Sequence, residues 1–219
     1  MMRARSGLSI ALVLACSAPA GLYAAQTPAT AQTSSLFAAF ISSAPDAHSS
    51  SYEIQKGDNL SKIAKKHQVT VDLLKKVNGL ADDKLIPGKK LKIPTYKLSV
   101  LIDKSDNMLT LRGDQEILKT YVVSTGLNNS TPVGTFKITD KLENPTWYKA
   151  GAVRQPGDKD NQLGTRWMGI TAKGYGIHGT LEPEKLGQQV TAGCVRMKTE
   201  EVEELYSIVP PGTEVVIQD

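Results

Sequence analysis

The hydrophobic pattern of residues 51–95 predicts two short helices between two short strands. Residues 52–55 alternate between apolar and polar side chains, which is typical of a half-buried strand. Asn59 and Thr70 each precede apolar positions at helical spacing, and their side chains are suited to capping a helix. The apolar positions are Leu60, Ile63, Ala64 and His67, then Val71, Leu74 and Val77. With a last strand over residues 90–93, the segment is predicted to be a small βααβ unit.

A different pattern begins after Pro94. Short alternating segments separated by turns containing Asn or Gly predict strands over residues 97–102, 108–111, 116–124, 134–139 and 214–217. One helix is predicted over residues 200–208, where Thr199 can cap its first turn and acidic residues follow. The chain has no parallel βαβ rhythm here. Residues 96–219 are therefore predicted to be a mainly β domain with a short C-terminal helix.

The first 50 residues have the composition of an export signal followed by a flexible linker. Two arginines precede an apolar stretch that is too short to cross a bilayer, and small residues follow it. Residues 1–25 fit a secretory signal peptide, and they also fit a lipoprotein signal in which Cys16 becomes the lipidated first residue. Residues 26–50 contain no Lys or Arg and are rich in Ala, Ser and Thr, which predicts a flexible linker with at most a brief helix around Phe37 and Phe40.

Length and charge limit the function classes. The chain has 219 residues, enough for one domain of ordinary size and one small domain. Its net charge is +4, and the lysines of the predicted helices have acidic neighbours but no interleaved aromatic residues. This pattern indicates solvated helix faces and does not predict a nucleic-acid partner. The charge is compatible with weak attraction to an anionic polymer of the cell envelope.

Cys194 and His178 are the candidate chemistry of the β domain. An exported chain would keep Cys194 without a disulfide partner, and His178 is the only histidine of that domain. A cysteine becomes a nucleophile when a neighbouring imidazole stabilises its thiolate, so His178 is the only internal candidate base. The amides of Gly193 and Cys194 can form an oxyanion hole, and Arg196 can hold a carboxylate on the same side of an extended segment.

Each of these residues also has an ordinary structural explanation. A lone cysteine in a β domain is more often buried and inert, a lone histidine is more often structural, and an exposed arginine is more often solvated. Together the three favour nucleophilic catalysis. A metal site is not predicted, because the domain has one cysteine and one histidine and no CxxC or HExxH motif. No other cofactor is predicted.

Residues 51–95 resemble a LysM domain over nearly the full length of that motif. The matching residues are Tyr52, Gly57, Asp58, Leu60, Ile63, Ala64, Leu74, Asn78, Leu85, Pro87, Gly88, Leu91 and Ile93. LysM domains bind the N-acetylglucosamine-containing glycan of peptidoglycan or chitin, so the resemblance implies glycan strands as a partner. The sugar groove of that family lies beside two loops, which here contain Gly57, Asp58, Asn59, Ile86 and Pro87. His67 is expected to border the helix core instead.

Residues 97–219 resemble the YkuD-type L,D-transpeptidase catalytic domain over essentially its whole length. Four separated runs match in the right order, at residues 131–136, 161–169, 174–180 and 191–197. The resemblance implies a mixed β-sandwich with a short C-terminal helix. It also implies an enzyme that needs no cofactor and acts on the stem peptides of peptidoglycan.

The same resemblance assigns roles to individual residues. Cys194 would attack the carbonyl that joins an L-centre to a terminal D-residue, and the acyl group would pass to an amine of another stem or of a protein. His178 would take the thiol proton and return one to the leaving amine. Gly193 would line the oxyanion hole and Arg196 would steer the substrate. The implied substrate-binding residues are Trp167, Tyr175, Gly179 and Thr180, of which Trp167 and Tyr175 fit the core equally well.

One departure from the family and three functions remain open at this point. Many members carry a second histidine where this chain has Ala192, so His178, oriented through the Gly179 carbonyl, would act as the only base. The leading function is a transferase. The alternatives are a hydrolase on the same scaffold (an L,D-carboxypeptidase or endopeptidase) and a peptidoglycan-binding protein without activity. Each implies export to the periplasm or cell envelope, with a membrane anchor only if Cys16 is lipidated.

Overall fold

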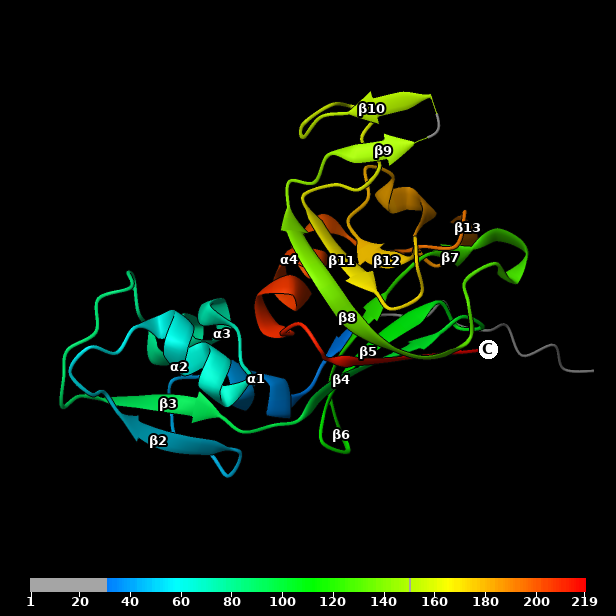
Figure 1. The fold of residues 1–219 in the computed structure, drawn as a ribbon. Helices are drawn as coiled ribbons and strands as arrows, with labels where there is room; N and C mark the ends of the chain where they lie inside the picture. Colours follow the sequence, from blue (N-terminus) through cyan, green and yellow to red (C-terminus); the bar gives the residue numbers. More distant parts are fainter. Residues whose placement is uncertain (1–30, 150) are drawn as a thin grey trace, which may run out of the picture.

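The computed structural model describes residues 31–149 and 151–219. The predicted signal peptide and Cys16 lie outside the described residues. A large body built on a nine-stranded sheet carries a small βααβ unit at one end (Figure 1). In the part of the chain that the structure describes, no helix is long and apolar enough to cross a membrane.

The small unit follows the hydrophobic pattern of its sequence. Its elements are β2 (Ser49–Glu53), α2 (Leu60–His67), α3 (Val71–Asn78) and β3 (Lys90–Pro94), with β2 and β3 antiparallel. The predicted caps are confirmed, because the Asn59 side chain accepts from the Lys62 amide and the Thr70 side chain accepts from the Leu73 amide. The unit has its own core of Ile54, Leu60, Ile63, Ala64, Leu74, Leu91 and Ile93.

The large sheet is mainly antiparallel, with the strand order β1-β6-β5-β4-β15-β8-β11-β12-β14. Its strands are β1 (Gln32–Thr33), β4 (Leu98–Asp103), β5 (Met108–Gly113), β6 (Glu116–Val122), β8 (Gly134–Glu143), β11 (Arg166–Ile170), β12 (Gly176–His178), β14 (Val195–Arg196) and β15 (Glu214–Gln218). Only the pairs β4–β15 and β12–β14 within this sheet are parallel. The prediction of a mainly β domain is confirmed.

Smaller elements complete the large body. Two short two-stranded sheets pair β9 (Trp147–Lys149) with β10 (Ala152–Arg154), and β7 (Thr125–Gly126) with β13 (Gln189–Thr191). Two 3-10 turns cover Leu127–Asn129 and Pro183–Lys185, and the helix α4 spans Thr199–Ile208. The predicted position of this helix is confirmed, but Thr199 is its first helical residue and not its cap, which is Lys198.

Residues 31–50 are ordered, contrary to the prediction of a flexible linker, although the brief helix predicted around Phe37 and Phe40 is present. Strand β1 pairs with β6, and the helix α1 (Ser35–Ile41) begins at Ser34, whose side chain accepts from the Phe37 amide. Phe37 and Phe40 are each only 2% exposed. The composition predicts flexibility because the segment is polar on average, yet the two buried aromatic rings and the strand pairing hold it against the core. We call residues 32–46 the strap.

The end of the strap is held by one buried ammonium group. Lys92 of β3 donates to the carbonyl oxygens of Ser42 at 2.9 Å and Ala44 at 2.7 Å. Its Nζ also lies 2.6 Å from an Asp46 carboxylate oxygen, and its side chain is 7% exposed. These contacts join the strap to the small unit, because Lys92 belongs to one and its partners belong to the other.

The small unit and the large body share a hydrophobic core. Leu73 and Val77 of α3 lie in the same cluster as Phe40 of the strap and Val202 of α4. The Thr70 hydroxyl donates to the Ser207 carbonyl at the end of α4. The orientation of the two units is therefore set by packing, and not by the length of a tether.

The strap predicts a clear difference between two neighbouring substitutions. Phe40→Ala is expected to lower the free energy of unfolding by about 3–5 kcal/mol, because it empties a site shared by all three parts. Leu36→Ala in the same helix is the matched control, since Leu36 is 38% exposed, and it should change the stability by no more than about 0.5 kcal/mol. Urea unfolding measures both. Equal small effects would mean that the strap does not contribute to the core.

Candidate active site

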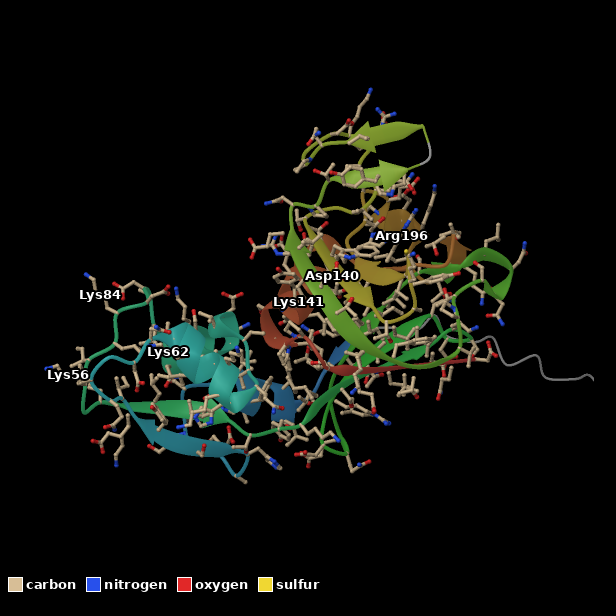
Figure 2. All side chains as sticks on the ribbon, viewed as in Figure 1. Lys56, Lys62, Lys84, Asp140, Lys141 and Arg196 are labelled. Carbon is tan, nitrogen blue, oxygen red and sulfur yellow. The ribbon has the colours of Figure 1, made fainter. Side chains whose placement is uncertain are left out.

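The parallel pairing of β12 with β14 brings the two candidate catalytic residues together. The register aligns Ile177 with Val195 and His178 with Arg196, and the Met197 amide donates to the His178 carbonyl at 2.9 Å. Cys194 directly precedes β14, so its turn lies beside the start of β12. The Cys194 thiol is 3.9 Å from the Gly174 carbonyl oxygen. The site therefore lies at the edge of the large sheet, where Figure 2 labels Arg196.

His178 is buried and held in one orientation. It is 3% exposed, and its Nδ1 lies 2.7 Å from the Gly179 carbonyl oxygen. A carbonyl oxygen can only accept, so Nδ1 carries the proton and the Nε2 lone pair is available as a base. The Trp167 ring stacks on the imidazole at 5.9 Å with an angle of 24°, and the Trp167 indole donates to Asp140 at 2.9 Å.

The environment keeps this imidazole neutral. Burial lowers the pKa of His178 to about 4, the positive charge of Arg196 acts in the same direction, and main-chain groups of Gly179 and Gln162 oppose it in part. Burial likewise raises the pKa of the Cys194 thiol, while the Gly176 amide and the Arg196 charge act to lower it. Burial therefore favours the uncharged form of both groups, the neutral imidazole and the neutral thiol.

The Cys194 turn is fixed by Thr191. The Thr191 hydroxyl donates to the Cys194 carbonyl oxygen at 2.6 Å and accepts from the Gly193 amide at 3.0 Å. The Gly193 amide is thus already used, contrary to the prediction that it lines an oxyanion hole. Among residues 31–149 and 151–219, the Cys194 amide has no acceptor, which leaves it as the available donor.

Gly193 has a steric role in place of the predicted one. Its φ is +129°, and a Cβ at this position would lie 2.5 Å from the Tyr175 ring. Only glycine therefore lets the turn pass under Tyr175. Tyr175 packs against the main core and this turn. Of its two predicted roles, substrate binding or core packing, this position matches core packing.

Arg196 faces a cavity but is already paired. Its guanidinium lies 3.1 Å from a Glu182 carboxylate oxygen and 3.0 Å from the Gln162 side-chain oxygen, and the buried Nε has no partner in the described part of the chain. Glu182 therefore occupies some of the guanidinium N–H donors of Arg196 that were predicted to hold a substrate carboxylate. The pairing compensates a charge whose side chain is only 13% exposed.

The cavity beside Arg196 has a volume of about 580 Å³. The cross-strand pair Trp147 and Arg154 of the β9–β10 hairpin lines it together with Gln162, Thr180 and Glu182. The next cross-strand pair of the hairpin, Tyr148 and Val153, is exposed. The hairpin lining was not predicted from the sequence, because nothing local to Trp147 or Arg154 marks them as neighbours of Arg196.

The other predicted substrate residues take different positions. Thr180 lines the cavity, where its hydroxyl accepts from the Glu182 amide at 3.0 Å. Gly179 is buried and contributes its carbonyl to His178. Trp167 packs against the imidazole of His178.

In the small unit, the predicted glycan residues are mainly structural. An Asp58 carboxylate oxygen accepts from the Tyr52 hydroxyl and from the Gln55 amide, each at 2.8 Å, and Asn59 caps α2. Gly57 forms the turn at φ +89°, and Pro87 is exposed in the other loop. Ile86 is an apolar side chain that is 56% exposed, so it is available to contact a ligand at these loops. His67 makes an edge-to-face contact with Tyr52 at the edge of the small core, as expected.

Comparison with known proteins gives two family matches. Residues 97–217 match the YkuD L,D-transpeptidase catalytic domain, and residues 52–94 match the LysM domain. A putative L,D-transpeptidase, YqjB, from Bacillus subtilis is 41% identical over 126 residues, which are 55% of this chain and 70% of that protein. A second Bacillus subtilis protein, the putative L,D-transpeptidase YkuD, is 31% identical over 173 residues, which are 76% of this chain and 97% of that protein.

Solved structures give a weaker likeness. An L,D-transpeptidase from Mycobacterium smegmatis has 19% sequence identity and a TM-score of 0.48, covering 62% of this chain and 65% of that chain. The chain thus spans slightly less than two thirds of that protein.

The buried His178 predicts a specific loss of stability in acid. Between pH 6.5 and about 4 the unfolded chain binds a proton on this imidazole that the folded protein does not bind. Stability is therefore present above pH 6.5 and is lost as the pH falls toward 4. The difference in unfolding free energy between the wild type and His178→Gln should decrease by about 3 kcal/mol from pH 7 to pH 4. Urea unfolding at the two pH values measures it, and a constant difference would contradict a neutral buried imidazole.

Proposed function

Because the chain belongs to the YkuD family of L,D-transpeptidase catalytic domains and carries a LysM domain before it, we propose that it is a cysteine acyltransferase that cross-links peptidoglycan stem peptides. The observation that carries the proposal is the strand pairing that sets Cys194 beside a base oriented through its Nδ1. The two domains also support a location at the cell wall or envelope.

In the first half-reaction, Cys194 attacks the carbonyl between the L-centre and the terminal D-residue of a donor stem. His178 Nε2 takes the thiol proton as the carbon–sulfur bond forms, and the carbonyl electrons move to the oxygen. The Cys194 amide is the donor for that oxyanion. The carbon–nitrogen bond then breaks, His178 returns the proton to the leaving amine, and a D-amino acid departs.

In the second half-reaction, an amine replaces the D-amino acid. The amine of a neighbouring stem attacks the thioester carbonyl while neutral His178 takes a proton from it. Collapse of the second oxyanion breaks the carbon–sulfur bond, and Cys194 regains a proton. A protein amine can serve the same chemistry, while water in this role gives a hydrolase.

The neutral resting pair supports a mechanism in which proton transfer accompanies attack. A buried imidazole with a pKa near 4 does not hold a thiolate as an ion pair in the resting state. The Gly176 amide and the Arg196 charge favour negative charge on the sulfur when it develops. With Ala192 in place of a second histidine, these two groups are proposed to assist His178 in stabilising the thiolate as it forms.

Substrate is proposed to reach Cys194 past the cavity beside Arg196. The Gln162 and Glu182 side chains hold the guanidinium in place, and the β9–β10 hairpin covers the other side of the cavity. A stem carboxylate entering here would contact Arg196 beside its existing partners. Arg196 therefore orients the substrate and balances charge around the thiol.

The transferase proposal predicts the products from a disaccharide tetrapeptide. The wild-type protein should form cross-linked dimers and release a D-amino acid. Cys194→Ala should abolish turnover because the nucleophile is lost, and His178→Gln should lower the rate by about 10²–10⁴-fold because the base is lost. Liquid chromatography with mass spectrometry separates the products. Tripeptide alone would indicate a hydrolase, and formation of neither product would contradict the substrate assignment.

The LysM assignment predicts that one exposed residue contributes to glycan binding. Ile86→Asp should weaken co-sedimentation with insoluble peptidoglycan by about 10-fold, because it removes apolar contact area between the two loops. Ile117→Asp is the matched control, since Ile117 is 49% exposed on the large body. If both variants bind as the wild type does, the groove is not at these loops. A point substitution is preferable to removal of residues 51–95, because the two units share a core.

A further inference from the structure

Thr131 lies beneath the Cys194 turn and contacts it directly. It is 2% exposed, and its hydroxyl donates to the Gly193 carbonyl oxygen at 2.9 Å. The same hydroxyl accepts from the Gly126 amide at 2.7 Å, so both of its hydrogen-bonding functions are used. Thr131 begins one of the four matching runs of the sequence, yet the acyl-transfer mechanism gives it no part.

A buried lysine fixes Thr131 from the other side. Lys104 is 2% exposed, and its ammonium donates to the Thr131 carbonyl oxygen at 3.0 Å. Its remaining charge partner is Asp219, at 2.9 Å. The backbone of Thr131 is therefore anchored by a charged hydrogen bond that water does not compete for.

Peptide geometry carries this anchoring to the active site. No peptide bond in the described residues is cis, so the Gly193 carbonyl and the Cys194 amide point in opposite directions across one planar group. Thr131 holds the Gly193 carbonyl toward the interior. The Cys194 amide must then point to the opposite side of the turn, where it has no acceptor in residues 31–149 and 151–219.

The alternative orientation of this peptide would oppose catalysis. A flipped peptide would aim the Gly193 carbonyl oxygen at the place where negative charge develops, and it would leave the buried Thr131 hydroxyl without its acceptor. The space below is also closed, because a Cβ on Gly126 would lie 3.0 Å from the Gly193 Cα. Thr191 holds only the two outer groups of the turn, so it does not fix this peptide by itself.

We propose that Thr131, anchored by Lys104, is the positioning residue of the oxyanion hole: its hydroxyl orients the Gly193–Cys194 peptide so that the Cys194 amide faces the developing oxyanion. The proposal rests on acyl transfer by Cys194, which is the proposed function. The proposal adds Thr131 to the residues Cys194, His178 and Arg196 of the proposed function. It requires no contact between Thr131 and the substrate.

Two reactions of the same thiol separate positioning from structure. With p-nitrophenyl acetate, the Cys194 sulfur attacks the ester carbonyl, an oxyanion forms, and the carbon–oxygen bond breaks to release nitrophenolate. With iodoacetamide, the sulfur displaces iodide at a saturated carbon, and no oxyanion forms. The acetylation rate therefore depends on the Cys194 amide, whereas the alkylation rate depends only on thiolate and access.

The decisive variant is Thr131→Val, which keeps the shape of the side chain and removes the hydroxyl. Acetylation should slow by about 10- to 100-fold, somewhat less than for complete loss of an oxyanion donor, while alkylation stays unchanged. Thr131→Ser should restore wild-type acetylation. Thr135→Val is the matched control, because Thr135 is exposed on β8, and it should change neither rate.

A second variant covers the case in which Thr131→Val does not fold, as judged by circular dichroism. Lys104→Met keeps the Thr131 hydroxyl and removes the ammonium group that anchors the Thr131 backbone. It should therefore slow acetylation by a smaller factor than Thr131→Val does, and it should leave alkylation unchanged. An equal loss of both rates, or undiminished acetylation in the folded variants, would overturn the proposal. So would failure of Thr131→Ser to restore the rate.

The acetate probe also separates this proposal from the proposed function. Acetylation needs the thiol, the base and the oxyanion donor, but it does not need a peptidoglycan stem. If Thr131 controls acetylation and the tetrapeptide is not processed, the positioning role stands and the substrate assignment fails. If the wild-type thiol is not acetylated at all, the positioning role itself is overturned.

Discussion

The parallel pairing of β12 with β14 is the interaction on which the site depends. It sets the Cys194 turn beside His178, although the two residues are sixteen positions apart in the chain. Because side chains alternate along a strand, a slip of one residue would turn His178 or Arg196 away from the thiol. Two further contacts hold the register: the bridge between Ser124 and Arg196, and the bond from the Met197 amide to the His178 carbonyl.

Burial governs the electrostatics of this arrangement. It disfavours the charged forms of both His178 and Cys194, so in the proposed mechanism charge develops on the pair only as the thiol attacks. Arg196 is the permanent charge nearby, and Glu182 balances it. The main chain supplies the remaining polarity, through the Gly179 carbonyl, the Gly176 amide and the Cys194 amide. The proposed mechanism depends on accurate backbone orientation, which is the role proposed for Thr131.

The strap packs against both domains and connects them. Phe37 and Phe40 enter the core that α3 and α4 share, and Lys92 holds the end of the strap against β3. A flexible tether would let the LysM domain move freely around the catalytic domain, whereas this packing holds it in one orientation. Figure 2 labels Lys56, beside the predicted glycan loops, at the far end of the molecule from Arg196. In the proposed function, glycan binding and acyl transfer would therefore occur at opposite ends of the molecule.

The sequence by itself determined the features that depend on neighbouring residues. Helical spacing and capping predicted α2 and α3, alternation predicted the main strands, and the matching runs predicted Cys194 and His178 as a pair. The tertiary structure alone decided which polar groups remain free. It uses the Gly193 amide for Thr191, pairs Arg196 with Glu182, and buries Phe37 in a segment whose composition predicts flexibility. Caps and periodicity act over a few residues, but a hydrogen-bond partner is chosen by the register of strands far apart in the chain, which local patterns do not encode.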